Sequence, residues 1–441
     1  MGRLIRALLV AALAGAIGLA NPSSAAAFDG FGELSADGSY GSGITFEVEL
    51  PGGAPDRLEL LLRTPGDGGW FVAPVSAGGT AATYVWDTSV DHVTPNTLVT
   101  YRWRATQDGT VTLSDEATIR YEDDRPALEW QRAQLGEATV HWYGDAEAQA
   151  RRFGEVTALG VARSEELLGT RLAGPVDVFV YATHEDFFGA LGPGAREWTG
   201  AAAYSELRTI FMYLGGGPDE AYLERAMVHE VAHVVFHDAT DNPYHEPARW
   251  LNEGIATWSE ASNADSERAI VEIEASGGGL FAFEAITEQF PIGERGGRLS
   301  YAQGTTMIDL IVSRYGEEAL ARIAAAYRDG ASDAQALEAG TGVAADELYE
   351  AFFAEFGVEP PGPVIAEPIP PSNVDRPQPG RVDPGGVDPG AEPPEIEPTP
   401  AEEAPAASGD EVVLLVLVIG GVAAVGAALA VGRRAARRDA A

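Results

Sequence analysis

Two histidines one helical turn apart, with a glutamate twenty residues after the second, constrain this chain more than any other feature. They lie in the stretch 227–258, which reads MVHEVAHVVFHDATDNPYHEPARWLNEGIATW. On a helix, residues four apart point about 40° from each other, so His229 and His233 face the same way. Any fold of this chain must therefore present both imidazoles from one face of one helix.

This pair of histidines has the spacing of a zinc site. Two imidazoles stacked in this way can bind one Zn²⁺ at about 2.0–2.1 Å each. Glu230 lies about 100° further round the helix, where it can act as a general base beside the metal. Because the spacing is typical of zinc metalloproteases, the sequence predicts a zinc site that hydrolyses peptide bonds.

A catalytic zinc needs a third ligand from the protein. We predict Glu253, which lies in the segment WLNEGIA at the start of an expected second helix. Pro247 just upstream suits a helix boundary. His245 and Glu246 are an alternative source of the third ligand, on a loop that would hold them less rigidly.

The two ends of the chain predict export and a membrane anchor. Residues 1–27 combine Arg3 and Arg6 with an apolar run and a small-residue cleavage site, as secretory signal peptides do. Residues 412–432 carry no charge and are long enough to span a bilayer as a single helix. The tail 433–441 carries four arginines. Because positive residues stay on the cytoplasmic side, we expect the preceding part of the chain to face outward from the cell membrane.

Composition limits the partners of the exported part. The net charge of −38 repels nucleic acid, so we expect no nucleic-acid partner. The chain has no cysteine. An exported protein of this kind therefore uses no disulfide bonds and has no cysteine to mask a zinc ion.

Residues 28–125 have the pattern of an antiparallel β-sandwich. Short alternating runs at 44–50, 57–63, 97–105 and 117–121 are separated by glycine- and proline-rich turns. The run 97–105 resembles a late strand of fibronectin type III or immunoglobulin-like domains. No catalytic constellation occurs here, so we expect a spacer or a binding module.

Residues 126–357 alternate strands with helices and then become mostly helical. We expect strands at 139–143, 176–181 and 209–214, with the last at a sheet edge where an extended peptide can pair. The glycines in 293–297 predict a break between helices. Beyond this region, residues 358–411 are rich in proline and glutamate, and 15 of the 28 prolines lie between 358 and 410. Such a segment cannot bury a core, and we expect a disordered, extended stalk.

The segment WLNEGIA, paired with HEVAH, resembles the gluzincin metallopeptidases, in particular their peptidase MA-like and aminopeptidase-N-like branches. The resemblance covers about residues 128–356. It implies an α+β fold with two lobes, a small mixed sheet above the zinc helix and a helical lobe below. It also implies roles for individual residues: zinc ligation by His229, His233 and Glu253, base catalysis by Glu230, and stabilisation of the oxyanion by Tyr301.

The chain departs from this family in two places. The Gly-x-Met-Glu-Asn segment by which aminopeptidase-N-like enzymes hold a free amine is not found before Thr209. Thr257 replaces the aspartate that thermolysin-like members keep four residues after the ligand glutamate, which leaves Glu260 as the candidate for orienting a histidine.

Other interpretations stay open at this stage. Tyr301 also fits simple aromatic packing. The whole chain also fits a non-catalytic surface binding protein with a peptidase-like domain, or an aminopeptidase.

Overall fold

The computed structural model describes residues 28–67, 69–192, 200–214, 220–260 and 264–362. The predicted signal peptide, most of the stalk, the predicted membrane segment and the tail lie outside these ranges, and their assignments stay predictions. Among the described helices, none has the length and apolar character needed to cross a membrane. The described chain divides into two compact units, one formed by residues 28–129 with 188–192 and the other by the remainder.

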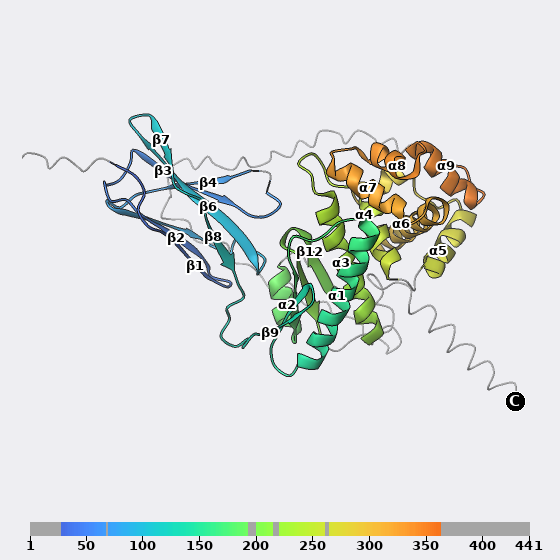
Figure 1. Ribbon diagram of the computed structural model, residues 1–441, viewed down its shortest axis with the longest axis horizontal. Helices are drawn as coiled ribbons and strands as arrows, with labels where there is room; N and C mark the ends of the chain where they lie inside the picture. The colour runs from blue at the N-terminus through green and yellow to red at the C-terminus, as the bar shows by residue number, and fades with distance from the viewer. Residues whose placement is uncertain (1–27, 68, 193–199, 215–219, 261–263, 363–441) are drawn as a thin grey trace, which may run out of the picture. The chain divides into compact units, whose positions relative to one another are not determined.

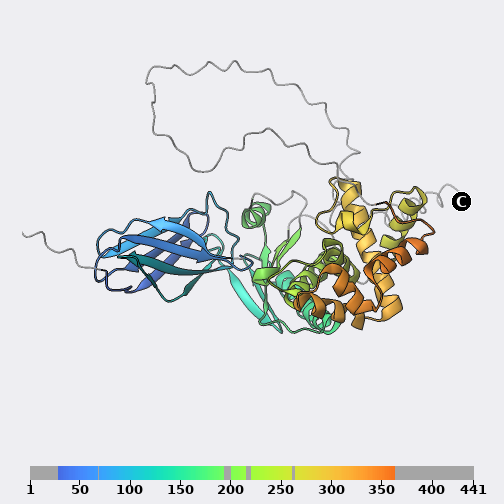
Figure 2. The same ribbon diagram turned by 90° about the horizontal axis from the view of Figure 1, so that it is seen from above.

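The first unit consists of antiparallel strands in two sheets, drawn in blue to teal in Figures 1 and 2. The three-stranded sheet has the order β1-β2-β5, and the other has the order β4-β3-β6-β7 with β8 also paired to β6. The strands are β1 (Leu34–Ser39), β2 (Gly43–Glu49), β3 (Arg57–Arg63), β4 (Phe71–Val75), β5 (Ala81–Trp86), β6 (Thr97–Gln107), β7 (Thr110–Leu113) and β8 (Ala117–Tyr121).

Alternation along these strands builds one core between the two sheets. In β2, Ile44, Phe46 and Val48 are buried, while the side chains between them are more exposed. In β6, Tyr101 and Trp103 point into the same core cluster. Successive side chains of a strand point to opposite faces, so this pattern buries one face of each sheet. The predicted β-sheet unit is confirmed, and its resemblance to fibronectin type III or immunoglobulin-like domains stays a prediction.

The second unit is built on a five-stranded mixed sheet with the order β12-β13-β11-β10-β9. The three central strands are parallel, and the two outer strands run antiparallel to their neighbours. The strands are β9 (Gln131–Leu135), β10 (Ala138–Trp142), β11 (Val176–Tyr181), β12 (Ala201–Tyr204) and β13 (Thr209–Tyr213).

Helices pack against this sheet and continue into a helical lobe (Figure 1). They are α1 (Glu147–Leu168), α2 (His184–Leu191), α3 (Glu220–Thr240), α4 (Arg249–Ser259), α5 (Ala264–Ser276), α6 (Glu294–Tyr315), α7 (Glu318–Arg328), α8 (Asp333–Thr341) and α9 (Ala345–Glu355). One continuous apolar core joins the sheet, through α1 and α3, to the helices that follow α4. The α+β class with a helical second half is therefore confirmed.

Two expectations about this unit were wrong in detail. The strand expected at a sheet edge, β13, pairs on both sides, and the edge is formed by β12, a run of three alanines and a tyrosine that carries no strand signal. Two of the three glycines expected to separate helices, Gly296 and Gly297, lie inside α6, which begins at Glu294. Gly293, at φ 105°, is the residue that ends the preceding loop.

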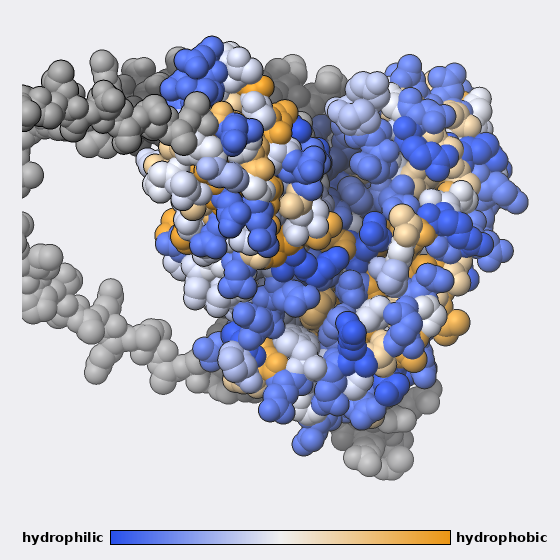
Figure 3. Space-filling model, turned by 60° about the vertical axis from the view of Figure 1, so that its left-hand side comes forward, coloured by the Kyte–Doolittle hydropathy of each residue, from blue (hydrophilic) through white to orange (hydrophobic). Residues whose placement is uncertain are grey.

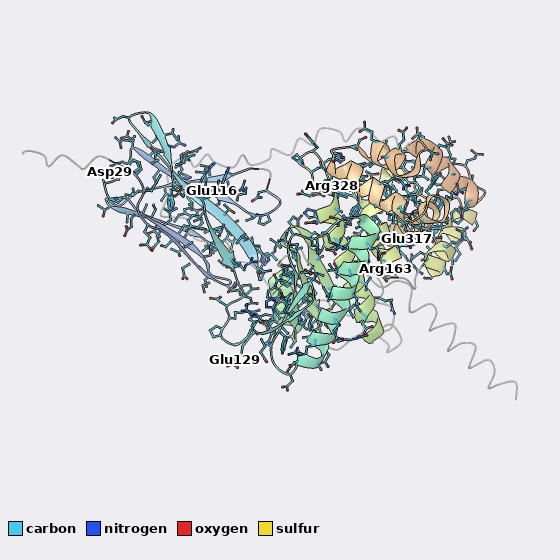
Figure 4. The ribbon with its side chains drawn as sticks, viewed as in Figure 1. Asp29, Glu116, Glu129, Arg163, Glu317 and Arg328 are labelled. Carbon is cyan, nitrogen blue, oxygen red and sulfur yellow. The ribbon has the colours of Figure 1, made fainter. Side chains whose placement is uncertain are left out.

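The charge of the chain lies on the outside of each unit. Six charged side chains labelled in Figure 4 are all exposed: Asp29, Glu116, Glu129, Arg163, Glu317 and Arg328. Hydrophilic residues cover most of the face seen in Figure 3, with apolar residues scattered between them. The few buried carboxylates are therefore exceptions that need a specific explanation.

Candidate metal centre

The predicted ligands come together at the junction of two helices. His229 and His233 project from α3 one turn apart, and Glu253 projects from α4. One ligand atom from each lies within 4.8 Å of the other two. These three side chains are the one group of this kind within the described ranges.

The distances between the donor atoms suit a zinc ion. Nε2 of His229 and Nε2 of His233 lie 3.6 Å and 3.4 Å from the same oxygen, Oε2 of Glu253. Ligand atoms bound tetrahedrally at about 2.0–2.2 Å lie roughly 3.3–3.6 Å apart. Two imidazoles and one carboxylate are also a donor set that zinc enzymes use. The residues therefore fit zinc in both chemistry and spacing.

Each histidine is oriented from its other ring nitrogen. Nδ1 of His229 lies 2.9 Å from Oε1 of Glu260, and Nδ1 of His233 lies 2.8 Å from Oδ1 of Asn252. Both oxygens are acceptors, so each Nδ1 carries a hydrogen, and each Nε2 is the ring atom that faces Glu253 and can bind a metal once it is deprotonated. Glu260 therefore takes the orienting role that the sequence suggested, and Asn252, inside the segment WLNEG, is a partner that the sequence analysis missed.

A close crossing of α4 and α6 holds Glu253 in place. A side chain at Gly254 would meet the backbone of Gly304 at 2.7 Å, and one at Gly304 would meet the carbonyl of Trp250 at 2.5 Å. Only glycine allows two helices to approach so closely. The crossing brings Tyr301, one turn before Gly304, toward Glu253. Gly254, which directly follows this ligand, is therefore required for the packing of the site.

Glu230 is held at the edge of the sheet. Its Oε2 accepts a 2.8 Å hydrogen bond from the backbone N–H of Ala203 in β12. The side chain is nearly buried, and it is adjacent in sequence to the ligand His229. The edge strand thus holds the carboxylate of the residue that directly follows the ligand His229.

Tyr301 lies on the helical side of the centre. Its ring centroid is 6.4 Å from that of His229 and 5.3 Å from that of Phe290. Burial, together with the charge of Glu253 and a hydrogen bond to it, raises the pKa of Tyr301 well above its usual value. The hydroxyl therefore stays protonated and can donate a hydrogen bond.

The metal ligands perturb one another strongly. Burial alone would raise the pKa of Glu253, but the charge of His233 and the hydrogen bonds to both histidines hold it well below the usual range. Burial alone would lower the pKa of His229, but its bonds to Glu253 and Glu260 raise it well above the ordinary value. The carboxylate is thus ionised, and metal binding has to displace a proton from the imidazole.

The alternative third ligand does not reach the centre. Nε2 of His245 lies 2.9 Å from the carbonyl of Ala331, and its Nδ1 lies 3.1 Å from the carbonyl of Glu246. The hydroxyl of Thr257 is buried and makes no hydrogen bond within the part of the chain that the structure describes. The threonine therefore does not replace the aspartate of thermolysin-like enzymes, because Glu260 and Asn252 do the orienting instead.

Comparison with known proteins gives a family match over the same region. The Peptidase MA superfamily model matches residues 157–355, a range that contains all five predicted site residues. No curated protein sequence matches the chain.

Two solved structures illustrate the distant likenesses that the structural comparison found. An M1 zinc metallopeptidase from Deinococcus radiodurans is 14% identical, with a TM-score of 0.34, and the alignment covers 78% of this chain and 98% of that one. An aminopeptidase N family protein from Idiomarina loihiensis is 10% identical, with a TM-score of 0.37 and coverage of 69% and 72%.

The family match and the metal centre agree. The histidines of α3 and the glutamate of α4 form a zinc-compatible set inside the matched range. Residues 157–355 therefore form a Peptidase MA superfamily domain with a His-His-Glu site, and the protein is a zinc metallopeptidase.

Proposed function

We propose that the protein hydrolyses peptide bonds in peptide or protein substrates, with Glu230 as the general base, while tethered to the cell membrane and facing outward. The observation that carries this proposal is the placement of Glu230. Its carboxylate is held by β12 next to the zinc-compatible set, and it is not itself part of that set. A site that only stored zinc would not need this additional carboxylate.

The residues of the chain divide the work as follows. His229, His233 and Glu253 would hold zinc, which when bound polarises the scissile carbonyl and makes water more acidic. Glu230 takes the proton from the attacking water and delivers it to the leaving amine. Tyr301 donates a hydrogen bond to the oxygen that becomes negative, because its raised pKa keeps the hydroxyl protonated.

The substrate is an extended peptide that pairs with β12. This strand lies at the edge of the sheet, and the N–H of Ala203 points toward Glu230, away from β13. Extended peptides commonly bind by adding a strand to such an edge. Binding along β12 would bring a peptide bond close to the base that the same strand holds.

The test of the catalytic proposal uses the full-length protein and a broad peptide library. We expect one zinc per chain and cleavage of library peptides, read by mass spectrometry. The matched control is Glu230→Gln, which should keep its zinc and lose about 100-fold or more of the activity. Zinc-bound protein that cleaves nothing, or cleavage that Glu230→Gln leaves unchanged, would support a binding protein instead. Resistance of every N-acetylated peptide would identify an aminopeptidase.

The membrane tether is tested separately from catalysis. We expect the full-length protein to stay in the membrane fraction after extraction at alkaline pH. A chain that ends at residue 411 should be released from cells with its activity intact. Protease added outside intact cells should digest the catalytic domain. Recovery of the full-length protein in the soluble fraction would contradict the tether.

A further inference from the structure

One cation lies beside the metal centre and has no role so far. Arg249 is the first residue of α4, and its Nη2 lies 3.6 Å from Oε1 of Glu253. The other oxygen of this carboxylate, Oε2, is the one that faces the two histidines. Only the carboxylate of Glu253 therefore separates Arg249 from the atoms that would hold zinc. This distance corresponds to at most about two residues of an extended peptide substrate, at roughly 3.3–3.6 Å per residue.

The guanidinium of Arg249 has unused hydrogen-bonding capacity. An arginine side chain carries five N–H donors. The contact with Glu253 is longer than a hydrogen bond, and within the described residues the side chain of Arg249 makes no hydrogen bond. Half of the side chain is exposed, 49% by area. A group that enters the site therefore finds these donors available.

The same guanidinium is nevertheless held in position. Its Cζ lies 5.1 Å from the centre of the Phe290 ring, and Phe290 packs edge-on against Tyr301 at 5.3 Å. The backbone N–H of Arg249 donates a 2.7 Å hydrogen bond to the carbonyl of Thr287. An anchored backbone and a stacked side chain reduce the entropy lost when a ligand binds.

Stability does not account for this arginine. A half-exposed ion pair at this distance contributes little to stability. A cation in the first turn of a helix is electrostatically unfavourable. Glu253 already has both histidines as partners. The position of Arg249 is thus better explained by a negatively charged ligand that binds to it.

We propose that Arg249 is a specificity-determining residue that binds a carboxylate of the substrate within about two residues of the scissile bond. Arginine pairs with a carboxylate through two parallel hydrogen bonds, and the open face of this guanidinium leaves room for them. The carboxylate comes either from an Asp or Glu side chain or from the C-terminus of a short peptide. This inference rests on the proposed function and narrows its substrates to peptides that are negatively charged near the cleaved bond.

The experiment compares matched peptides with the full-length, zinc-loaded protein. One pair differs only in a C-terminal acid or amide, and the other only in Glu or Gln next to the cleaved bond. We expect wild type to favour the acidic member of at least one pair by about tenfold or more in kcat/KM, mainly through KM. Arg249→Gln should bring that ratio close to one, and Arg249→Lys should retain part of it. The pair that responds identifies the source of the carboxylate.

Two further measurements separate this proposal from a structural role and from the proposed function. Arg163→Gln removes the same charge from the exposed face of α1 and should leave the peptide ratio unchanged. Peptide binding to Glu230→Gln, measured by calorimetry, tests Arg249 even if no peptide is cleaved. An acid-to-amide and Glu-to-Gln ratio near one in wild type would overturn the proposal. The proposal would also be overturned if Arg249→Gln lowered kcat/KM equally for both peptides of each pair and also lowered zinc affinity.

Discussion

Each unit of this protein buries carboxylates, and one acid from each unit, Glu59 and Glu253, shows two opposite ways of neutralising a buried charge. In the N-terminal unit, Glu59 is 2% exposed and pairs with the guanidinium groups of Arg57 and Arg104. In the catalytic unit, Glu253 is 9% exposed and faces the imidazoles of His229 and His233. Arginine is always charged, so the first arrangement is complete without a ligand.

The second arrangement is chemically incomplete. An imidazole can release the proton that arginine keeps, so the two Nε2 atoms and the carboxylate oxygen that lie together here can become three metal ligands. Such a set gains stability from a divalent cation. The partner of a buried acid therefore distinguishes a structural acid from a metal ligand. A guanidinium neutralises the carboxylate permanently, whereas imidazoles together with the carboxylate can bind a metal ion.

The largest effect should follow from removing the acid of the catalytic unit. Glu253→Ala removes one of three zinc ligands. Removing a residue that only hydrogen-bonds to a ligand already lowers metal affinity by about 10–100-fold, so we expect zinc affinity to fall by far more than 100-fold here. Peptidase activity should disappear with the metal. Competition with a chelator measures the affinity, and Glu317→Gln, at an exposed acid, is the control. Tight zinc binding by Glu253→Ala would remove the distinction between the two units.

The next effect should follow from the acid that orients a ligand. Glu260→Gln keeps an oxygen near Nδ1 of His229 but removes its charge, so we expect zinc affinity to fall by about 10–100-fold. Asn252→Ala tests the same role at His233. Both variants should remain folded, as shown by circular dichroism. If both bind zinc as wild type does, then the outer partners do not set the affinity.

The metal ligands were predictable because their spacing is local. His229, Glu230 and His233 lie within five consecutive residues. The period of the helix alone therefore fixes the directions in which their side chains point. Glu253 followed from the need for a third ligand in a nearby helix. The main strands and helices could be predicted because apolar alternation and turn residues are also local signals.

The missed features all depend on contacts between distant segments. β12 is paired through its backbone and contains three alanines, so no side-chain pattern marks it. The contact between Gly254 and Gly304 joins residues of two helices, and neither glycine alone predicts it. Asn252 and Arg249 look like ordinary helix residues until the fold places one beside His233 and the other beside Glu253.

A smaller effect, confined to the N-terminal unit, should follow from changing Glu59. Glu59→Gln keeps an oxygen that can accept the hydrogen bond from Arg104 but removes its charge, and we expect the free energy of unfolding of this unit to fall by about 1–2 kcal/mol. Zinc affinity should not change. Denaturant unfolding, followed beside a zinc titration, measures both quantities. A loss of zinc affinity would contradict the view that this acid is purely structural.

The smallest effect should come from Glu267, a third kind of buried acid. It is 3% exposed, and burial followed by the charge of Glu260 raises its pKa from 4.5 to about 7, although Arg298 opposes the shift. The folded protein therefore holds a proton here that the unfolded chain releases above pH 4.5. The stability this gives is fully present below pH 4.5 and is lost as the pH rises through 7.

Replacing Glu267 with Gln should remove this pH dependence, since the amide is neutral at every pH. At pH 8 we expect Glu267→Gln to be more stable than wild type by about 1–3 kcal/mol, because one pKa unit corresponds to about 1.4 kcal/mol. At pH 4 the two should be nearly equal. Urea unfolding of the zinc-loaded protein at both values measures the difference. Equal stability at pH 8 would mean that Arg298 neutralises Glu267 as the arginines neutralise Glu59, and the contrast between the two units would then hold only for the metal ligands.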